Sequence, residues 1–253
     1  MPRSVPVVAL AAFFAISSAS AVSAQPAASA AQPTVDALVA RNLQAKGGEA
    51  KLKAIQSMRM TGRVSIQGME LPMTITAKRP NLMRQEMQIQ DKRIVTAFDG
   101  QKAWMINPMT GSEAPQELTG PQADMAKDQS DFDGALVDWK AKGHTVEVVG
   151  AEEVGGVKTQ KVKVTKKNGQ VQYFFLSPDT GLEIKTTTEV LQGGTPMTVE
   201  TELSDYRSVD GIMLPHALKT SINGTPTASI TVDKIELNTP LDETLFTLPK
   251  PKA

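Results

Sequence analysis

The 253-residue chain has no cysteine, few aromatic residues (4%) and no excess of either charge. Without cysteine, the chain has no disulfide framework and no cysteine that could carry a lipid anchor. Its 27 basic residues match its 27 acidic residues, so it lacks the net basic charge that is typical of nucleic-acid binding. The composition therefore predicts no nucleic-acid partner.

Residues 1–24 have the order of a secretory signal peptide. Arg3 precedes an apolar run from Val5 to Ile16, and small residues follow up to Ala24. This run is too short to span about 30 Å of hydrocarbon, and the small residues favour cleavage after Ala24. Losing Arg3 leaves 26 of the 27 basic residues against 27 acidic ones, a formal net charge of −1. No later segment has 18 uninterrupted apolar residues, so we expect a soluble protein of the periplasm.

The remaining chain predicts a short leader and a single domain. Residues 25–33 are rich in Ala, Pro and Gln and have little to bury, which indicates a disordered leader. Residues 34–250 suit one β domain, because β-sandwiches and barrels often reach about 200 to 250 residues. Thr34 is placed to cap a helix, which Gly47 and Gly48 end before a second helical turn.

A period of two in hydrophobicity begins at Met58 and predicts antiparallel strands. Turn signals at Gly68, at 79–81, at Asp91 and at 99–100 divide the first strands. Alternation returns after residue 144, and Asn168-Gly169 indicates a hairpin. About eleven strands result, the later ones at 145–149, 159–165, 171–176, 182–190, 197–203, 212–222 and 228–235.

Residues 107–143 interrupt the alternation. Gly and Pro indicate a loop, after which Phe132, Ala135, Leu136 and Trp139 recur at helical spacing and predict an amphipathic helix ended by Gly143. A long sheet with one apolar face must close, fold over or leave a concave apolar surface. The predicted helices are the covers available for that surface.

Residues with catalytic or metal-binding chemistry are sparse. His144 and His216 are the two histidines, and nucleophile elbows, phosphate loops and zinc-binding helices are missing from the sequence. Residues 129–140 resemble a calcium loop but have Gln129 and Lys140 where acidic ligands are needed. We therefore expect no enzyme, no bound metal and no cofactor.

Methionine is unusually dense in one region. Eight of the eleven methionines after the signal peptide lie between Met58 and Met109, mostly on the apolar side of the predicted strands. Unbranched, polarizable Met side chains adapt to varied apolar ligands, and they also fill irregular cores. Composition leaves both interpretations open.

Arg79 lies on the same side of its strand as the apolar residues, by alternation from Leu71 to Ala77. A cation at the rim of an apolar face can hydrogen-bond ligand carbonyls or hold a covering loop closed. Alternatively, its aliphatic chain lies along the apolar surface and its guanidinium is solvated by water.

Several motifs resemble the LolA family of periplasmic lipoprotein carriers. The strongest is Lys78-Arg79-Pro80-Asn81-Leu82, followed at the family's spacing by Asp99-Gly100, Trp104 and Asn107-Pro108. Gly47-Gly48 and the segment 238–249 add to the likeness.

The resemblance implies an incomplete antiparallel β-barrel, a half-pipe whose concave apolar face is covered by helices. In the family this cavity shields the acyl chains of lipoproteins, its arginine holds the lid, and the residue after the leucine lies at the cavity mouth. Arg79 and Met83 take those positions here. The expected lipid-binding groove comprises Met58, Met60, Leu71, Met73, Ile75, Arg79, Leu82, Met83, Met87 and Trp104. The expected lid residues are Phe132, Leu136 and Trp139.

The leading hypothesis is a monomeric carrier of acylated lipoproteins or related lipids towards the outer membrane. It would receive cargo from an inner-membrane donor complex and pass it to an outer-membrane acceptor. The alternative is a sensor of the same fold that binds a membrane partner's periplasmic domain and responds to lipid or lipoprotein.

Overall fold

The computed structural model describes residues 33–192 and 195–249, which fall in one compact unit, Gln32–Ala253. The expected signal peptide 1–24 and nearly all of the expected leader 25–33 lie outside the described residues. Among the helices that are described, none is both long and apolar enough to cross a membrane.

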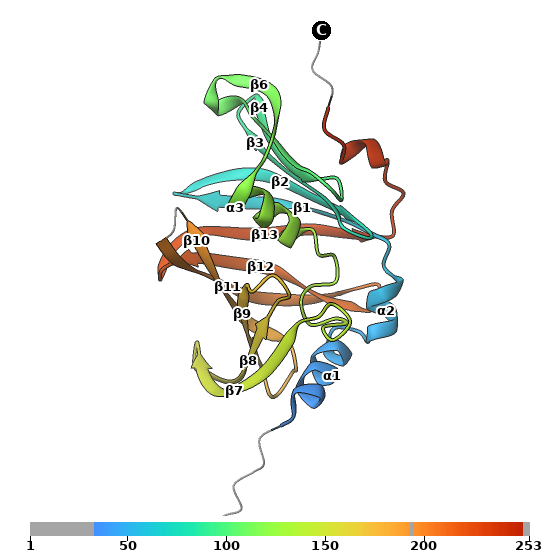
Figure 1. Ribbon diagram of the computed structural model, residues 1–253, viewed down its shortest axis with the longest axis vertical. Coiled ribbons are helices and arrows are strands. Elements are labelled where there is room, and N and C mark those ends of the chain that lie inside the picture. Colours follow the sequence, from blue (N-terminus) through green and yellow to red (C-terminus); the bar gives the residue numbers. More distant parts are fainter. Residues whose placement is uncertain (1–32, 193–194, 250–253) are drawn as a thin grey trace, which may run out of the picture. The chain divides into compact units, whose positions relative to one another are not determined.

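An antiparallel sheet of 13 strands dominates the described chain (Figure 1). Strand neighbours follow the order β6-β5-β4-β3-β2-β1-β13-β12-β11-β10-β9-β8-β7, which leaves β6 and β7 as the edges of an open sheet. The strands are β1 Ser57–Ile66, β2 Met69–Lys78, β3 Leu82–Ile89, β4 Lys92–Phe98, β5 Ala103–Asn107, β6 Ser112–Glu117, β7 Thr145–Val154, β8 Val157–Thr165, β9 Val171–Leu176, β10 Glu183–Gln192, β11 Thr195–Val209, β12 Ile212–Ile222 and β13 Thr225–Leu237. The prediction of a mainly antiparallel half-barrel is confirmed, with 13 strands in place of about eleven.

The helices are α1 Val35–Ala45, α2 Glu49–Ala54 and α3 Gly120–Gln129, with 3-10 turns η1 Pro108–Thr110 and η2 Glu243–Leu245. As expected, α1 is capped by Thr34, whose hydroxyl accepts a hydrogen bond from the Ala37 N–H. Its apolar side packs on one end of the sheet. That cluster joins Leu38, Val39 and Leu43 of α1 to Val146, Val162, Val164, Phe174 and Leu176 of β7, β8 and β9.

The helix predicted around 132–139 is wrong. Residues 131–143 form consecutive turns, and the helix of this region, α3, ends at Gln129. Gly134 and Asp138 have positive φ values of 71° and 51°, a conformation that a right-handed helix does not contain. The apolar spacing arose because Ala135, Leu136 and Val137 are buried together against α1 and the sheet.

Strand β6 was also missed by the prediction, because its sequence SEAPQE has no apolar alternation. It forms because β5 offers backbone partners, with Trp104 opposite Glu117 and Met105 opposite Gln116. Tertiary pairing thus determines a strand at this edge that local hydrophobicity does not indicate.

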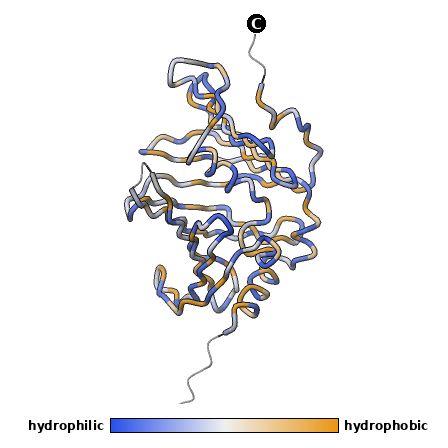
Figure 2. Tube along the Cα trace, in the orientation of Figure 1, coloured by the Kyte–Doolittle hydropathy of each residue, from blue (hydrophilic) through white to orange (hydrophobic). Residues whose placement is uncertain are grey.

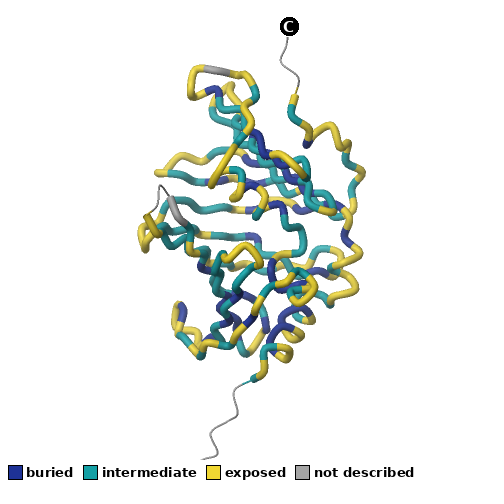
Figure 3. Tube along the Cα trace, in the orientation of Figure 1, coloured by how far each residue is buried: buried dark blue, intermediate teal, exposed yellow. Residues whose placement is uncertain are grey.

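Hydrophobic and polar residues alternate along the strands (Figure 2), as a sheet with two different faces requires. Burial is uneven along the sheet (Figure 3): it is high where α1 meets β7, β8 and β9, whereas the central strands are mostly of intermediate exposure. The sheet therefore keeps a partly accessible central region between its covered ends.

Candidate lipid-binding face

The inner face is defined here as the sheet face that α1 and α3 contact. At the β7 end it contains Val162 and Phe174, which pack against α1. At the other end it contains Met83, Phe98 and Ala103, which pack against Ala126 of α3. Directly opposite residues of paired strands share a face, so the register assigns the positions between these two ends.

Seven of the ten predicted groove residues lie on the inner face. Met58 is opposite Ala77, Met60 opposite Ile75 and Val64 opposite Leu71, while Ala77 faces Met83 and Met73 faces Met87 across the next pair. Met73 and Met83 are buried at 3% and 4% exposure, and the others are half-buried. The seven are Met58, Met60, Leu71, Met73, Ile75, Met83 and Met87.

Two predicted groove residues lie on the opposite, outer face. Trp104 is paired with Ala97, one residue out of phase with Phe98, and clusters with Val95 and Ala97. Its indole Nε1 donates to the Phe246 carbonyl at 2.7 Å, so the C-terminal segment covers it. Leu82 precedes Met83 and is opposite Lys78, and it therefore also points outward. The groove assignment of Trp104 and Leu82 is wrong because alternation directs them away from the inner face.

The resemblance implied that Met83 lies at the mouth of the cavity, but in the structure this side chain is not at an opening. It is buried beneath α3 with Phe98, Ala103 and Ala126. Met83 thus helps to hold α3 against the inner face at this end of the sheet.

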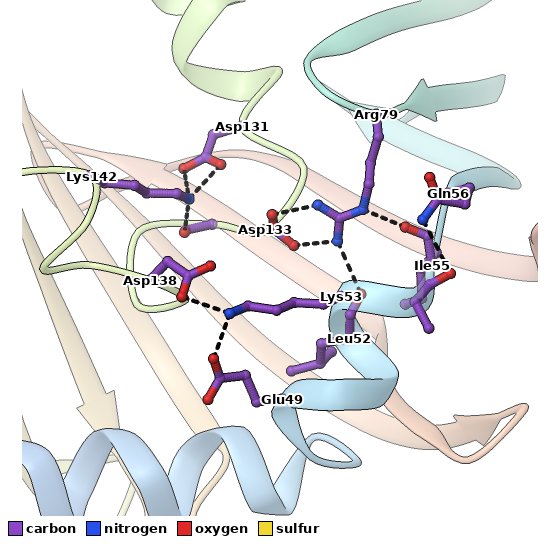
Figure 4. A network of polar contacts seen from close by, with 12 residues as sticks. Glu49, Leu52, Lys53, Ile55, Gln56, Arg79, Asp131, Asp133, Asp138 and Lys142 are labelled. Atoms are coloured by element: carbon purple, nitrogen blue, oxygen red, sulfur yellow. Dashed lines mark hydrogen bonds and ion pairs between the residues drawn. The ribbon is translucent and has the colours of Figure 1, made fainter.

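Arg79 fastens two covering segments to each other (Figure 4). Its guanidinium donates two hydrogen bonds to the Asp133 carboxylate, each 2.5 Å, and further ones to the backbone carbonyls of Leu52 (3.0 Å) and Ile55 (2.5 Å). It also lies 4.9 Å from the centre of the Phe132 ring. The hydrogen bonds to Asp133 raise the pKa of Arg79 further above its ordinary value, so the side chain stays charged. The geometry agrees with the interpretation that Arg79 holds a covering loop.

The loop that Arg79 holds is fixed by two further cations (Figure 4). Lys53 of α2 lies 2.7 Å from an Asp138 oxygen, and Lys142 donates to Asp131 and to the Gly134 carbonyl. The Asp131–Lys142 contact is incompatible with a continuous helix, because 11 residues of α-helix would separate the two by about 16 Å.

The predicted lid residues separate into two environments. Leu136 is buried at 3% exposure and Trp139 is partly buried, both against the α1 cluster, so they belong to the packed end of the sheet. Phe132 lies beside Arg79. Their role as a lid stays a prediction.

Helix α3 is a cover that sequence analysis missed, because its sequence GPQADMAKDQ has little apolar periodicity. It contacts β4 and β5 through Ala123 and Ala126, while Asp128 near its C-terminal end pairs with Lys166 beyond β8 at 2.6 Å. The helix thus connects strands from both ends of the open sheet. Met125 remains 51% exposed on its surface.

A cavity of about 330 Å³ lies at the hairpin end of β12 and β13, and most of the residues that line it are polar. Its lining includes Ser65, Lys219, Ser229 and Glu202, which the register places on the outer face. Thr220 and Ala228, which belong to the inner face by the same register, also line it. The residues that line it include no methionine, so it differs in chemistry from the methionine-rich part of the inner face.

Sequence comparison identifies no matching family model and no matching curated protein. Structure comparison does find similar folds. A DUF1329 family protein from Desulfovibrio piger has a TM-score of 0.59 at 14% identity, covering 84% of this chain and 97% of its own. A LolA superfamily protein from Nitrosomonas europaea has a TM-score of 0.56 at 10% identity, covering 85% of this chain and 98% of its own. The chain therefore has a LolA-like fold, as its motifs had predicted.

Proposed function

We propose that this protein is a non-enzymatic periplasmic carrier. Its inner face would shield the acyl chains of lipoproteins, or of related lipids, during transfer towards the outer membrane. The observation that carries the proposal is a continuous apolar inner face at the centre of an open sheet, with covers at both ends and half-buried Met and Ile side chains between them.

The central strands support acyl binding because their inner positions are apolar over several neighbours. Met60 is opposite Ile75 on one side and Ile235 on the other, and Val64 is opposite Leu71 and Ile230. Burial of about ten methylenes at roughly 0.8 kcal/mol each contributes about 8 kcal/mol before the costs of ordering and opening. The net value is smaller, which leaves release to an acceptor possible.

The cover supports a carrier because its fastening is polar and local. Arg79 joins α2 to the 131–143 turns through hydrogen bonds and one ion pair, which can break and reform without unfolding the sheet. The LolA-like fold is compatible with this role, and the sequence resemblance implies a lid-holding arginine at the position of Arg79.

The decisive experiment is native mass spectrometry, with lipid extraction, of the protein purified from a periplasmic fraction. We expect co-purifying acylated species. A clean apo mass with no uptake of added lipoprotein or lipid would overturn the proposal, and a stoichiometric protein partner without lipid would favour the sensor alternative.

Replacement of Met60 with Gln tests the face itself. Gln has nearly the shape of Met but places an amide on the apolar inner surface, so affinity for a fluorescent acyl probe should fall about 3- to 10-fold. Thr61→Gln, at the neighbouring position whose side chain points to the other face, is the matched control and should bind normally. Equal binding by both variants would place the acyl site elsewhere.

A further inference from the structure

Three threonines from adjacent strands form a row on the inner face. Thr186 of β10 is opposite Thr201 of β11, and Thr201 is opposite Thr220 of β12. Thr188 lies two residues further along β10 and shares the same face. All four are half-buried. The threonine row is the name used below for these four residues.

The register continues the row in both directions. Thr186 is opposite Phe174, which packs against α1 and so belongs to the inner face. Beyond Thr220 the same line passes to Ala228, Ile66 and then Met69. Hydroxyl-bearing and methionine-bearing parts of the inner face are therefore continuous.

The hydroxyls of the threonine row are free to bind a ligand. Within the described part of the chain, no hydrogen bond joins any of these four side-chain oxygens to another group. Each hydroxyl can donate one hydrogen bond and accept two. Because neighbouring strands are about 4.8 Å apart, three threonines span roughly 10 Å, the width of a small polar head.

Charged residues beside the threonine row point to the outer face. Glu183, at the start of β10, is an inner-face exception, since it is opposite Leu176 and pairs with Lys46 after α1 at 2.7 Å. Lys185 and Glu200 lie 3.4 Å apart on the outer face, and Lys185 also lies 4.3 Å from the centre of the Phe175 ring. Lys219 is opposite Glu202 on that face. An anionic head would thus meet no cation from these strands at the threonine row, whereas a neutral head rich in oxygen meets hydroxyl donors and acceptors.

We propose that the threonine row binds the neutral, oxygen-rich head of an acyl lipid, such as a glycerol ester, while its chain lies on the adjoining Met- and Ile-bearing strands. This inference rests on the proposed carrier function and narrows it to a ligand class. Hydroxyl groups would select the ester and glycerol oxygens, and apolar positions would hold the chain.

The experiment compares two lipids with the same palmitoyl chain, 1-monopalmitoylglycerol and palmitoyl lysophosphatidylglycerol, by displacement of diphenylhexatriene from the full mature chain. We expect tighter binding of the neutral lipid. The double variant Thr186→Val/Thr201→Val keeps the side-chain shape and should lose about 5- to 30-fold of affinity for the glycerol ester, since each lost hydrogen bond lowers affinity by roughly 2- to 10-fold. Its affinity for diphenylhexatriene should not fall.

Thr231→Val is the matched control, because Thr231 is opposite Arg63 and Ala217 on the outer face. It should behave as the unmodified protein. If the unmodified protein binds neither lipid nor the apolar probe, the carrier function itself fails. If both lipids bind equally well and the double variant binds as before, the carrier function stands and the threonine row is overturned as the head site.

Discussion

Arg79 shows how one side chain can determine whether a face is covered. Its planar guanidinium satisfies a carboxylate on one segment and two backbone carbonyls on another. With 19% of the side chain exposed and 18% of Asp133, the pair is only partly shielded from water, so its strength depends on geometry more than on charge alone.

Replacement of Arg79 with Leu should loosen the 131–143 turns. The change leaves the Asp133 carboxylate and two carbonyls without their partner, which costs about 1–3 kcal/mol of local stability. Hydrogen exchange by mass spectrometry should show faster exchange in 131–143 and in α2, with the central strands unchanged, and bound acyl probe should be released faster.

Arg79→Lys is the companion variant, because it keeps the charge and loses the planar fork. We expect intermediate exchange. If Arg79→Leu exchanged at the rate of the unmodified protein, Arg79 would not be the fastening of the cover.

His144 provides a residue-scale test of pH dependence. Burial and the nearby Lys142 lower its pKa below the ordinary value of 6.5, while Asp131 opposes the shift. Its Nδ1 accepts from the Lys167 N–H at 3.3 Å, which requires a neutral ring nitrogen. The folded state therefore disfavours the imidazolium form of His144. The stability that neutral His144 contributes is present above pH 6.5 and decreases as the pH falls below that value.

The measurement for His144 is an NMR titration of its ring protons, with His144→Asn used to assign the signal. We expect a midpoint below 6.5. In the asparagine variant, the free energy of unfolding should depend less on pH across the same range. A midpoint at or above 6.5 would contradict the inferred environment.

At the scale of elements, α3 is a thin cover fixed at two points. Small residues, Ala123 and Ala126, pack it against β4 and β5, and the Asp128–Lys166 ion pair holds its C-terminal end. Small contact residues bury little apolar area. We therefore expect α3 to separate from the sheet more readily than α1, whose leucines and valines pack against β7, β8 and β9.

Replacement of Asp128 with Asn should detach the end of α3. The ion pair is mostly shielded, with side-chain exposures of 13% for Lys166 and 24% for Asp128, and its loss should cost about 1 kcal/mol. The expected result is about 5-fold faster amide exchange confined to 120–130. Asp124→Asn on the same helix is the control and should leave amide exchange unchanged. If the two variants had equal effects, loss of the Asp128–Lys166 ion pair would not be the cause of the faster exchange.

At the scale of the whole described molecule, two meanders meet at one pairing. Strands β1 to β6 form one, β7 to β13 form the other, and β1 and β13 join them. The joint contains a register shift between Thr61 and Gly62, where the backbone of β13 approaches closely. A Cβ placed on Gly62 would lie 2.2 Å from the Thr231 carbonyl oxygen, which is backbone and cannot turn aside.

Replacement of Gly62 with Ala should therefore weaken the union of the two meanders. We expect a loss of about 2–3 kcal/mol in the free energy of unfolding, measured by urea denaturation, with reduced protection of amides in β1 and β13. Ser65→Ala on the same strand should change stability by less than about 0.5 kcal/mol. If the Gly62 variant were as stable as the control, the backbone of β13 would be able to shift and accommodate the added methyl group.

The sequence alone determined the antiparallel strands, the capped first helix and the LolA-like motifs. These features depend on local alternation, capping and turn residues, which act within a few positions of the chain. Alternation also placed Met58, Met60, Met73 and Met87 on one face, because the side-chain period of a strand is fixed at two.

Only the tertiary structure decided which groups cover the two faces. Trp104 pairs with Phe246 on the outer face, and Arg79 reaches Asp133 on a segment 54 residues away. Residues 131–143 form turns despite helical spacing, and β6 forms without apolar alternation. For Trp104 and Arg79 the deciding partner is distant in sequence, whereas for β6 it is the neighbouring strand β5. In each case the free energy that selects the conformation comes from packing and hydrogen bonds that the hydrophobic pattern does not contain.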